Sequence, residues 1–303
     1  MPTPTEYLQK ILERQTFSDD DQEMKDLRNR RKEIESLIRG AYPDSTITIQ
    51  YGGSKAKGTM IKNSYDLDII CYFEHDDTGP GESLKDIYYS VKETLETKYD
   101  VVEKCSVLRV KKKKSNDDFH IDVVPGRYVD DTEMDVYLYQ ANGEKSRLKT
   151  NLEKHISHIR DSEVVPAIRI MKLWRNRYAV DVKTFVLELW VCEVLKGHKA
   201  KKLHEQVWHL WEAMRDNIDD TSVKDPANPD GNDLSDIFNE STKMALEVAA
   251  RLTLETVGQR DDVDGWKKVF GETDESDNDA DDLEKVVRAI HNPPKAYYSN
   301  GMA

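Results

Sequence analysis

The chain is 303 residues long, with 38% hydrophobic and 34% charged residues and a formal net charge of −13. This length provides for one large domain or two closely packed lobes with an ample core. No apolar run approaches the roughly 18 residues that a membrane-spanning helix needs, and the acidic balance disfavours a protein that wraps long nucleic acid.

The N-terminal region and the cysteines indicate the compartment. The first residues lack a basic region followed by an apolar stretch, so we expect no secretory signal. The three cysteines, Cys71, Cys105 and Cys192, are scattered and form no CxxC pair. We therefore expect reduced thiols, no zinc ribbon and a cytoplasmic location.

The first 51 residues predict an arm, a helix and a strand. Residues 1–20 are polar and interrupted by proline, and we expect them to form an arm. From residue 22 to residue 41, apolar side chains recur at helical spacing opposite a charged face, which predicts a long helix ended by Pro43. Residues 46–51 (TITIQY) are rich in β-branched and aromatic side chains, as strands prefer.

A glycine-rich turn and two aspartates follow, and the rest of the chain can be placed around them. Gly52-Gly53 ends the strand with bare backbone, and Ser54 adds a hydroxyl where the N–H groups of a short helix can bind an anion. Asp66 and Asp68 open the next predicted strand, whose period of two puts both carboxylates on one face. Two such charges repel each other unless a cation lies between them. Mg²⁺ is a suitable cation because it binds carboxylates together with phosphate oxygens and water.

The next segment predicts a helix and a β-hairpin. Residues 75–81 read as a loop, and Ser83 is placed to cap the helix that follows. Strand-like runs occur at 101–102, 105–110 and 119–125. The lysines at 111–114 lie between the last two runs, so we expect these two to form a hairpin with a basic tip. That tip is either a solvated turn or a site for an activator.

After a polar stretch at 130–149, which we expect to cross between lobes, the sequence is mostly helical. Periodic apolar residues predict helices at 150–159, 162–178, 183–195, 203–214, 234–257 and 283–290, with tryptophans in the core and an acidic, low-complexity run at 272–282. Arg169, Lys172 and Arg175 step by three along one helix face. On spacing alone, this basic face is a solvated stripe or a set of phosphate contacts.

The turn and the aspartates resemble the active-site signature of the DNA polymerase beta-like nucleotidyltransferases. The matching residues are Gly53-Ser54, Gly58-Thr59 and Asp66-Leu67-Asp68. In that superfamily a third carboxylate lies on a strand beside the Asp-x-Asp strand, and Asp122 in the run IDVVP fits it. His120 would share the face of Asp122, as a neighbour rather than a ligand. Segments 165–174, 183–189, 225–232 and 266–271 look like the bacterial cGAS/DncV-like nucleotidyltransferases (CD-NTases).

This resemblance implies an α+β fold, with a polymerase beta-like core of mixed sheet and flanking helices and a helical C-terminal lobe of the oligoadenylate-synthetase type. We expect a catalytic lobe over residues 1–149, a mostly helical lobe over 150–303, and an active site in the cleft between them. The resemblance also implies that Asp66, Asp68 and Asp122 hold two Mg²⁺, with Mn²⁺ as a substitute. Gly53 and Ser54 would bind the triphosphate, Lys172 would neutralise its outer phosphates, and Thr184 would contact the nucleotide.

The implied activity is that of a nucleotidyltransferase that joins nucleoside triphosphates into a cyclic di- or trinucleotide, a second messenger for antiphage defence. The implied partners are the nucleotide substrates, an effector activated by the product and accessory regulatory proteins, without a membrane. A nucleic-acid activator stays open, although the sequence has no zinc-binding Cys/His cluster of the animal enzyme. The small residues at 296–303 resemble termini that an accessory ligase conjugates in some members, and a frayed end is the simpler interpretation.

Two other functions share the same signature. One is a template-independent nucleotidyltransferase that acts on RNA or tRNA 3′ ends or on another hydroxyl acceptor. The other is a non-catalytic module that binds nucleotide and regulates a partner, a role for which the loss of a carboxylate is the usual sign. All three acids are present in this sequence.

Overall fold

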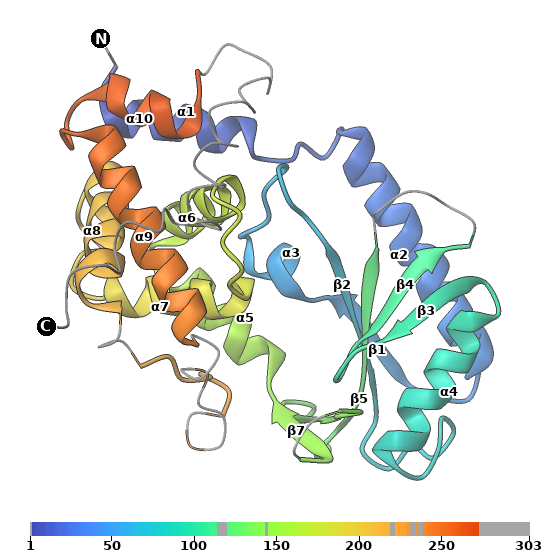
Figure 1. Ribbon diagram of the computed structural model, residues 1–303. Coiled ribbons are helices and arrows are strands. Elements are labelled where there is room, and N and C mark those ends of the chain that lie inside the picture. Colours follow the sequence, from blue (N-terminus) through green and yellow to red (C-terminus); the bar gives the residue numbers. More distant parts are fainter. Residues whose placement is uncertain are drawn as a thin grey trace, which may run out of the picture.

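The computed structural model describes residues 2–113, 120–142, 145–218, 222–228, 230, 234 and 239–272 (Figure 1). The helices are α1 Pro4–Arg14, α2 Gln22–Ala41, α3 Gly53–Lys57, α4 Leu84–Glu96, α5 Leu152–Arg160, α6 Val165–Arg177, α7 Thr184–Val194, α8 Leu203–Asp216, α9 Glu240–Val257 and α10 Val263–Phe270. The strands are β1 Ile47–Tyr51, β2 Leu67–Phe73, β3 Tyr99–Glu103, β4 Leu108–Lys112, β5 Ile121–Tyr128, β6 Val136–Tyr139 and β7 Arg147–Thr150. The expected α+β fold, a mixed sheet with flanking helices followed by a helical region, is confirmed.

The sheet is mixed because one of its strand pairs is parallel. Its main order is β1-β2-β5-β4-β3, and β6 and β7 continue from the end of β5. Strands β2 and β5 run parallel, while β4 pairs with β5 in the antiparallel sense. The hairpin expected from the two strand-like runs around the basic tip is therefore present as β4 and β5. Its tip, from Lys114 to Phe119, lies outside the described residues.

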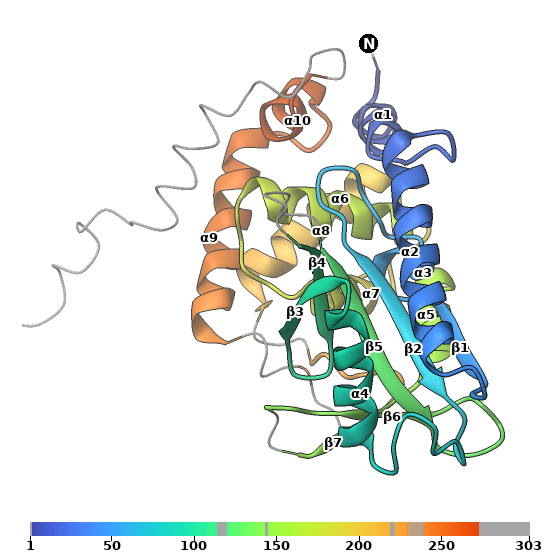
Figure 2. The same ribbon diagram turned by 90° about the vertical axis from the view of Figure 1, so that its right-hand side faces the viewer.

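Alternation along the strands separates two faces of the sheet. Leu67, Ile69 and Val123 point into a core formed with α2 and α4, and both helices lie over this face in the two views (Figures 1 and 2). Asp68 and Asp122 alternate with these residues and therefore belong to the opposite face. Helix α3 lies on that opposite side, between the sheet and the C-terminal helices (Figure 1).

The C-terminal helices enclose their own core. Four tryptophans, Trp174, Trp190, Trp211 and Trp266, are at most 1% exposed, which confirms their predicted role in the core. In the part of the chain that the structure describes, no helix combines the length and apolar character needed to cross a membrane.

The N-terminal residues were expected to form an arm, and the structure corrects this prediction. They form helix α1, which starts with a capping box between Thr3 and Glu6 and with Pro4 in its first turn. Its Tyr7 and Leu8 are buried in the helical core. The Tyr7 hydroxyl donates to the Gly271 carbonyl after α10 at 2.5 Å, so α1 lies beside α10 (Figures 1 and 2).

Three other boundaries differ from the sequence-based expectations. Residues 130–149 contain the strands β6 and β7 rather than only a crossover. The strand predicted from residue 105 starts at Leu108, and the helix predicted from residue 234 starts at Glu240, capped by Asn239. Most of the acidic run at 272–282, the helix predicted at 283–290 and the tail at 296–303 lie outside the described residues.

Candidate active site

The turn between β1 and α3 is built directly against Asp68. The Gly52 N–H donates to the Asp68 carbonyl at 2.9 Å, and Gly53 has a φ of +50°, a conformation that favours glycine. A Cβ added to Gly53 would lie 1.6 Å from Oδ2 of Asp68. The glycine therefore allows the backbone to approach the carboxylate, and Ser54 follows it in the first turn of α3.

The strand register aligns two of the three predicted acids. Asp68 on β2 is the Cα partner of Asp122 on β5, and neighbouring strands lie about 4.8 Å apart. Asp66 immediately precedes β2, and its side chain is 54% exposed. The structure thus brings Asp68 and Asp122 side by side on one face and places Asp66 two residues before Asp68, at the entrance to the strand.

The electrostatics of Asp68 reflect this crowding. Burial, together with the charges of Asp122 and Asp66, raises the pKa of Asp68 to about 6. Its charged form is therefore disfavoured in the protein without a bound cation. A cation at this face would stabilise the carboxylate form.

The other two acids contact basic side chains. Arg109 on β4 is paired with Asp122 across the sheet, and its Nε and Nη2 donate to Oδ1 and Oδ2 of Asp122 at 2.9 and 2.8 Å. Nε2 of His120 lies 3.5 Å from Oδ1 of Asp66. His120 is thus a neighbour of the acids, as expected.

The donor set fits a hard divalent cation such as Mg²⁺. Aspartate oxygens are the protein ligands that Mg²⁺ prefers, and Asp68 and Asp122 present them from adjacent positions on one face. Within the described ranges, no three His, Cys, Asp or Glu side chains already form a metal-binding group. In this structure the carboxylate of Asp122 faces Arg109 and that of Asp66 lies next to His120.

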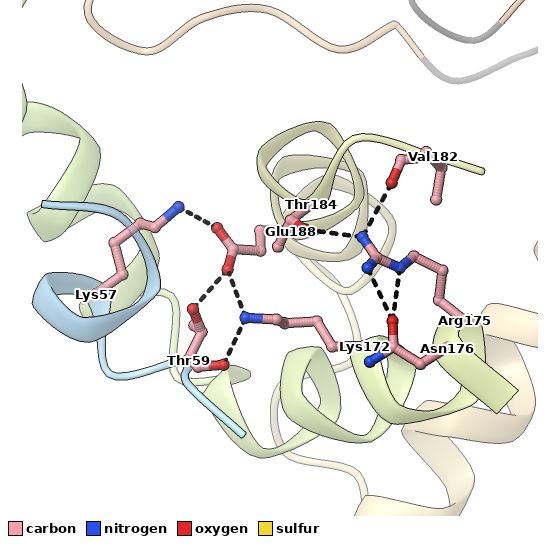
Figure 3. Close-up of polar contacts among 8 residues, drawn as sticks. All are labelled: Lys57, Thr59, Lys172, Arg175, Asn176, Val182, Thr184 and Glu188. Atoms are coloured by element: carbon pink, nitrogen blue, oxygen red, sulfur yellow. Dashed lines mark hydrogen bonds and ion pairs between the residues drawn. The ribbon is translucent and has the colours of Figure 1, made fainter. Parts of the chain in front are cut away.

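A buried polar network lies beside this site and connects α3 with α6 and α7 (Figure 3). Glu188 of α7 is fully buried and forms an ion pair with Lys57 at the end of α3. Its Oε1 accepts the hydroxyl of Thr59 and lies 3.7 Å from Nζ of Lys172. Lys172 also donates to the Thr59 carbonyl at 2.7 Å. Burial lowers the pKa of Lys172 to about 8, and Glu188 opposes this shift.

This network shows where the structure places the predicted nucleotide contacts of the C-terminal helices. Lys172 is 5% exposed and contacts Thr59 and Glu188. The hydroxyl of Thr184, the first residue of α7, accepts from Nη1 of Arg175 at 2.7 Å (Figure 3). Contacts of Lys172 and Thr184 with nucleotide stay predictions.

The basic face of α6 is not a solvated stripe. Arg169 donates to the hydroxyl of Thr16 at 2.7 Å and to the Leu12 carbonyl, while Lys172 is buried and Arg175 is half-buried. All three side chains hydrogen-bond to protein atoms, so the solvated interpretation is wrong. Their contact with phosphate stays a prediction.

Sequence reasoning missed Arg109, Lys57 and Glu188. Arg109 precedes Asp122 by 13 residues. The hairpin that contains both residues was predicted, but the strand register that places them opposite each other was not. Glu188 and Lys57 are separated by 131 residues. A glutamate within an otherwise apolar helix was the available signal, because a buried acid needs a partner.

Comparison with known proteins rests on structure. No protein-family model and no curated protein matches this sequence. CdnG, a CD-NTase of Bradyrhizobium diazoefficiens solved in complex with GTP, superposes with a TM-score of 0.66 at 15% identity, covering 95% of this chain and 98% of CdnG. The dinucleotide cyclase DncV of Vibrio cholerae, solved with ATP and GTP, gives a TM-score of 0.66 at 13% identity over 90% and 97% of the two chains.

A third similar structure is that of CdnC from Escherichia coli, solved in complex with a HORMA protein. It gives a TM-score of 0.64 at 18% identity over 88% of this chain and 96% of CdnC. In all three cases the similarity spans most of both chains. The chain therefore has the fold of the bacterial CD-NTases, as the resemblance of its signature residues led us to expect.

Proposed function

We propose that this protein is a metal-dependent nucleotidyltransferase that joins ribonucleoside triphosphates into a cyclic di- or trinucleotide. The observation that carries the proposal is the alignment of Asp68 with Asp122 on neighbouring strands, with the Gly53 turn packed against Asp68. Similarity to a CD-NTase solved with GTP and to a dinucleotide cyclase solved with ATP and GTP supports this class of substrate.

The proposed roles follow from the chemistry of each group. Asp66, Asp68 and Asp122 hold two divalent cations, Mg²⁺ or Mn²⁺, which when bound lower the pKa of the attacking hydroxyl and stabilise charge on the leaving phosphates. The backbone at Gly53 and the hydroxyl of Ser54 hold the triphosphate. Lys172 adds positive charge near that turn, and Thr184 contacts the nucleotide.

The reaction we propose is an in-line displacement at phosphorus. A ribose hydroxyl of one nucleotide attacks the α-phosphorus of another, the bond to the β-phosphate oxygen breaks, and pyrophosphate leaves. A carboxylate oxygen of Asp122 accepts the proton of the attacking hydroxyl. A second transfer between the same two nucleotides closes a dinucleotide ring. A trinucleotide ring needs two further transfers, the last of which closes it, and each transfer releases one pyrophosphate.

The biological role we propose is antiphage signalling. The cyclic product would act on a separate effector protein. CdnC was solved in complex with a HORMA protein, and we extend this to an accessory regulatory protein for the present chain. Both proposed partners depend on the proposed activity, so a test of either one comes after the activity has been tested.

The experiment incubates the purified protein with all four ribonucleoside triphosphates and Mg²⁺ or Mn²⁺, followed by phosphatase treatment and mass spectrometry of the products. We expect a phosphatase-resistant cyclic nucleotide from the wild type and none from Asp66→Asn or Asp68→Asn. Near-normal turnover in either variant would refute the catalytic assignment. Transfer of nucleotide to added tRNA, without a cyclic product, would support the transferase that acts on a hydroxyl acceptor.

Two glycine variants provide matched controls for the turn. Gly53→Ala and Gly58→Ala introduce the same side chain at positive φ, +50° and +76°, so both carry a backbone penalty of about 1–3 kcal/mol. Only the Cβ at Gly53 would meet Asp68, because no atom lies within 4 Å of the corresponding position at Gly58. We expect Gly53→Ala to lose product formation and Gly58→Ala to retain it. Equal losses would assign the effect to backbone strain.

A further inference from the structure

The carboxylate of Asp122 is held by a bidentate contact with Arg109. The two donors, Nε and Nη2, reach different oxygens of the carboxylate at 2.9 and 2.8 Å. Such a fork-to-fork pair restricts the rotation of both side chains and is stronger than a single hydrogen bond. Both oxygens that could bind a cation are therefore already engaged by a protein cation.

The sheet brings the two side chains together by its register. Asp68, Asp122 and Arg109 occupy the same row across β2, β5 and β4, and Val102 on β3 ends this row. The Arg109 side chain is 30% exposed and Val102 is 48% exposed. The guanidinium is therefore partly open to solvent on the β3 side of Asp122.

Asp122 accounts for all the hydrogen bonds that the Arg109 guanidinium makes to the described residues. Arg127, by contrast, donates to three different groups, the carbonyls of Asp77, Gly81 and Glu82. Release of Arg109 therefore breaks two hydrogen bonds to a single group and leaves no other described acceptor without its donor.

A divalent cation and a guanidinium that share one carboxylate repel each other. We propose that Arg109 is a positioning residue, which occupies Asp122 while no metal is bound and must give up this carboxylate to the metal, so that it sets the metal affinity of the site. This inference rests on the proposed function, because that function assigns Asp122 to the metal. It accounts for the orientation of the Asp122 carboxylate, whose two oxygens both face Arg109 in the present structure.

The test measures binding of Mn²⁺ alone, by isothermal titration calorimetry and by electron paramagnetic resonance of free Mn²⁺, at pH 8 without nucleotide. We expect Arg109→Gln to bind Mn²⁺ about three- to tenfold more tightly than the wild type, the range expected when a partly exposed competing charge is removed. Arg109→Lys keeps the charge and loses the fork, so its affinity should lie between the two.

Lys111→Gln is the matched control. Lys111 lies two residues from Arg109 on the same strand and face, and it pairs across the sheet with Asp100 rather than with Asp122. Its substitution removes one positive charge without touching the Asp122 contact, so we expect a smaller gain than for Arg109→Gln. Equal gains in the two variants would overturn the specific role of Arg109.

The outcomes separate this inference from the proposed function. Suppose that Asp122→Asn weakens Mn²⁺ binding but neither Arg109→Gln nor Arg109→Lys binds Mn²⁺ more tightly than the wild type. This result would overturn the inference about Arg109 and would leave the proposed metal site standing. If the wild type binds no Mn²⁺, or if Asp122→Asn binds as tightly as the wild type, the proposed metal site and the inference both fail. A lower melting temperature of Arg109→Gln without metal, recovered with Mn²⁺, would support the exchange.

Discussion

The surroundings of Asp68 disfavour the ionised form of its carboxyl group. Its strand position places it beside Asp122, and the Gly53 turn covers it, so that water reaches the carboxylate only in part. The result is a pKa raised to about 6. A carboxylate in this state stabilises a bound cation and destabilises the protein when the cation is absent.

We therefore predict that Asp68→Asn stabilises the metal-free protein while it abolishes product formation. The pKa of Asp68 rises from 3.8 to about 6 on folding, so ionisation destabilises the folded state as the pH increases through this window. The free energy of unfolding of the variant should exceed that of the wild type by about 3 kcal/mol above pH 6 and by only about 1 kcal/mol near pH 4.5. Urea unfolding in EDTA between pH 4.5 and pH 8 measures the difference.

Asp86→Asn serves as the control of opposite sign. Hydrogen bonds from Ser83 lower the pKa of Asp86, so its charged form stabilises the folded state at neutral pH and this contribution is lost as the pH falls. The Asp86 variant should be less stable than the wild type at pH 8. A gain of stability in both variants, or a gain for Asp68→Asn that does not depend on pH, would contradict the electrostatic explanation.

At this scale the sequence predicted the acids better than their partners. Asp66 and Asp68 were proposed because a strand period of two and a turn motif are local patterns, and Asp122 was proposed because the run IDVVP resembles the third-carboxylate strand of the superfamily. The contacts of Asp122 with Arg109 and of Glu188 with Lys57 depend on strand register and on helix packing, which residue spacing does not determine. Lys172 was correctly placed on a helix, yet its burial beside Glu188 could not be read from the charge of its neighbours.

The connection between α1 and α2 acts as a brace for the loop that leads to Asp66. The Gln15 carbonyl accepts from the Lys62 N–H at 3.1 Å, and Oε1 of Gln15 accepts from the Asn63 N–H at 2.8 Å. Phe17 packs edge-on against Tyr65, with ring centroids 4.9 Å apart. The loop is thus fixed from the N-terminal side, immediately before β2.

We predict that Gln15→Ala lowers the rate of product formation on the order of tenfold, because the loop before Asp66 loses a constraint and small displacements of reacting groups are costly. Stability should fall by only about 1 kcal/mol, the contribution of one hydrogen bond. Steady-state rates and thermal unfolding measure the two effects separately.

Gln22→Ala is the control for this prediction. The amide of Gln22 donates to Asp26 within the exposed first turns of α2 and does not touch the loop. Gln22→Ala should therefore leave the rate of product formation unchanged. A similar loss of rate in both variants, or full activity of Gln15→Ala, would show that the brace does not position Asp66.

Elements with strong local signals were predictable, and elements defined by distant partners were not. Helix α2 follows its apolar period from Gln22 to Ala41, and α4 begins after its Ser83 cap, as expected. Helix α1 was missed although Thr3, Pro4 and Glu6 form a recognisable start signal, because the polar composition was given more weight. Strands β6 and β7 have four residues each, too few for alternation to stand out, and they pair mainly with each other.

A buried cluster of polar and charged side chains connects the N-terminal and C-terminal cores of the molecule. Lys57 and Thr59 come from the segment after β1, whereas Lys172 and Glu188 come from α6 and α7 (Figure 3). Glu188 is the single acid among these four residues, and its two oxygens serve Lys57 on one side and Thr59 and Lys172 on the other. The turn that carries Gly53 is thereby fixed relative to the C-terminal helices.

The last prediction concerns this network. Glu188→Gln leaves the ammonium groups of Lys57 and Lys172 buried without a countercharge, so the free energy of unfolding at pH 7 should fall by about 3–5 kcal/mol. Burial already lowers the pKa of Lys172 to about 8, and Glu188 counteracts this shift. In the variant, Lys172 should lose its proton at lower pH than in the wild type. Because a lowered lysine pKa destabilises the protonated folded state, the deficit should shrink as the pH rises from 7 to 9.5.

A double-mutant cycle with Lys57→Met identifies the origin of the effect. If the ion pair couples the two parts, the loss in the double variant should be smaller than the sum of the single losses by about 0.5–3 kcal/mol, since Lys57 is no longer left unpaired. Additive losses would show that Glu188 acts through Lys172 and Thr59 alone. A deficit in Glu188→Gln that is unchanged at pH 9.5 would instead indicate lost packing. The cycle therefore distinguishes an electrostatic junction between α3 and α7 from a packing defect, which the contacts of Glu188 alone do not separate.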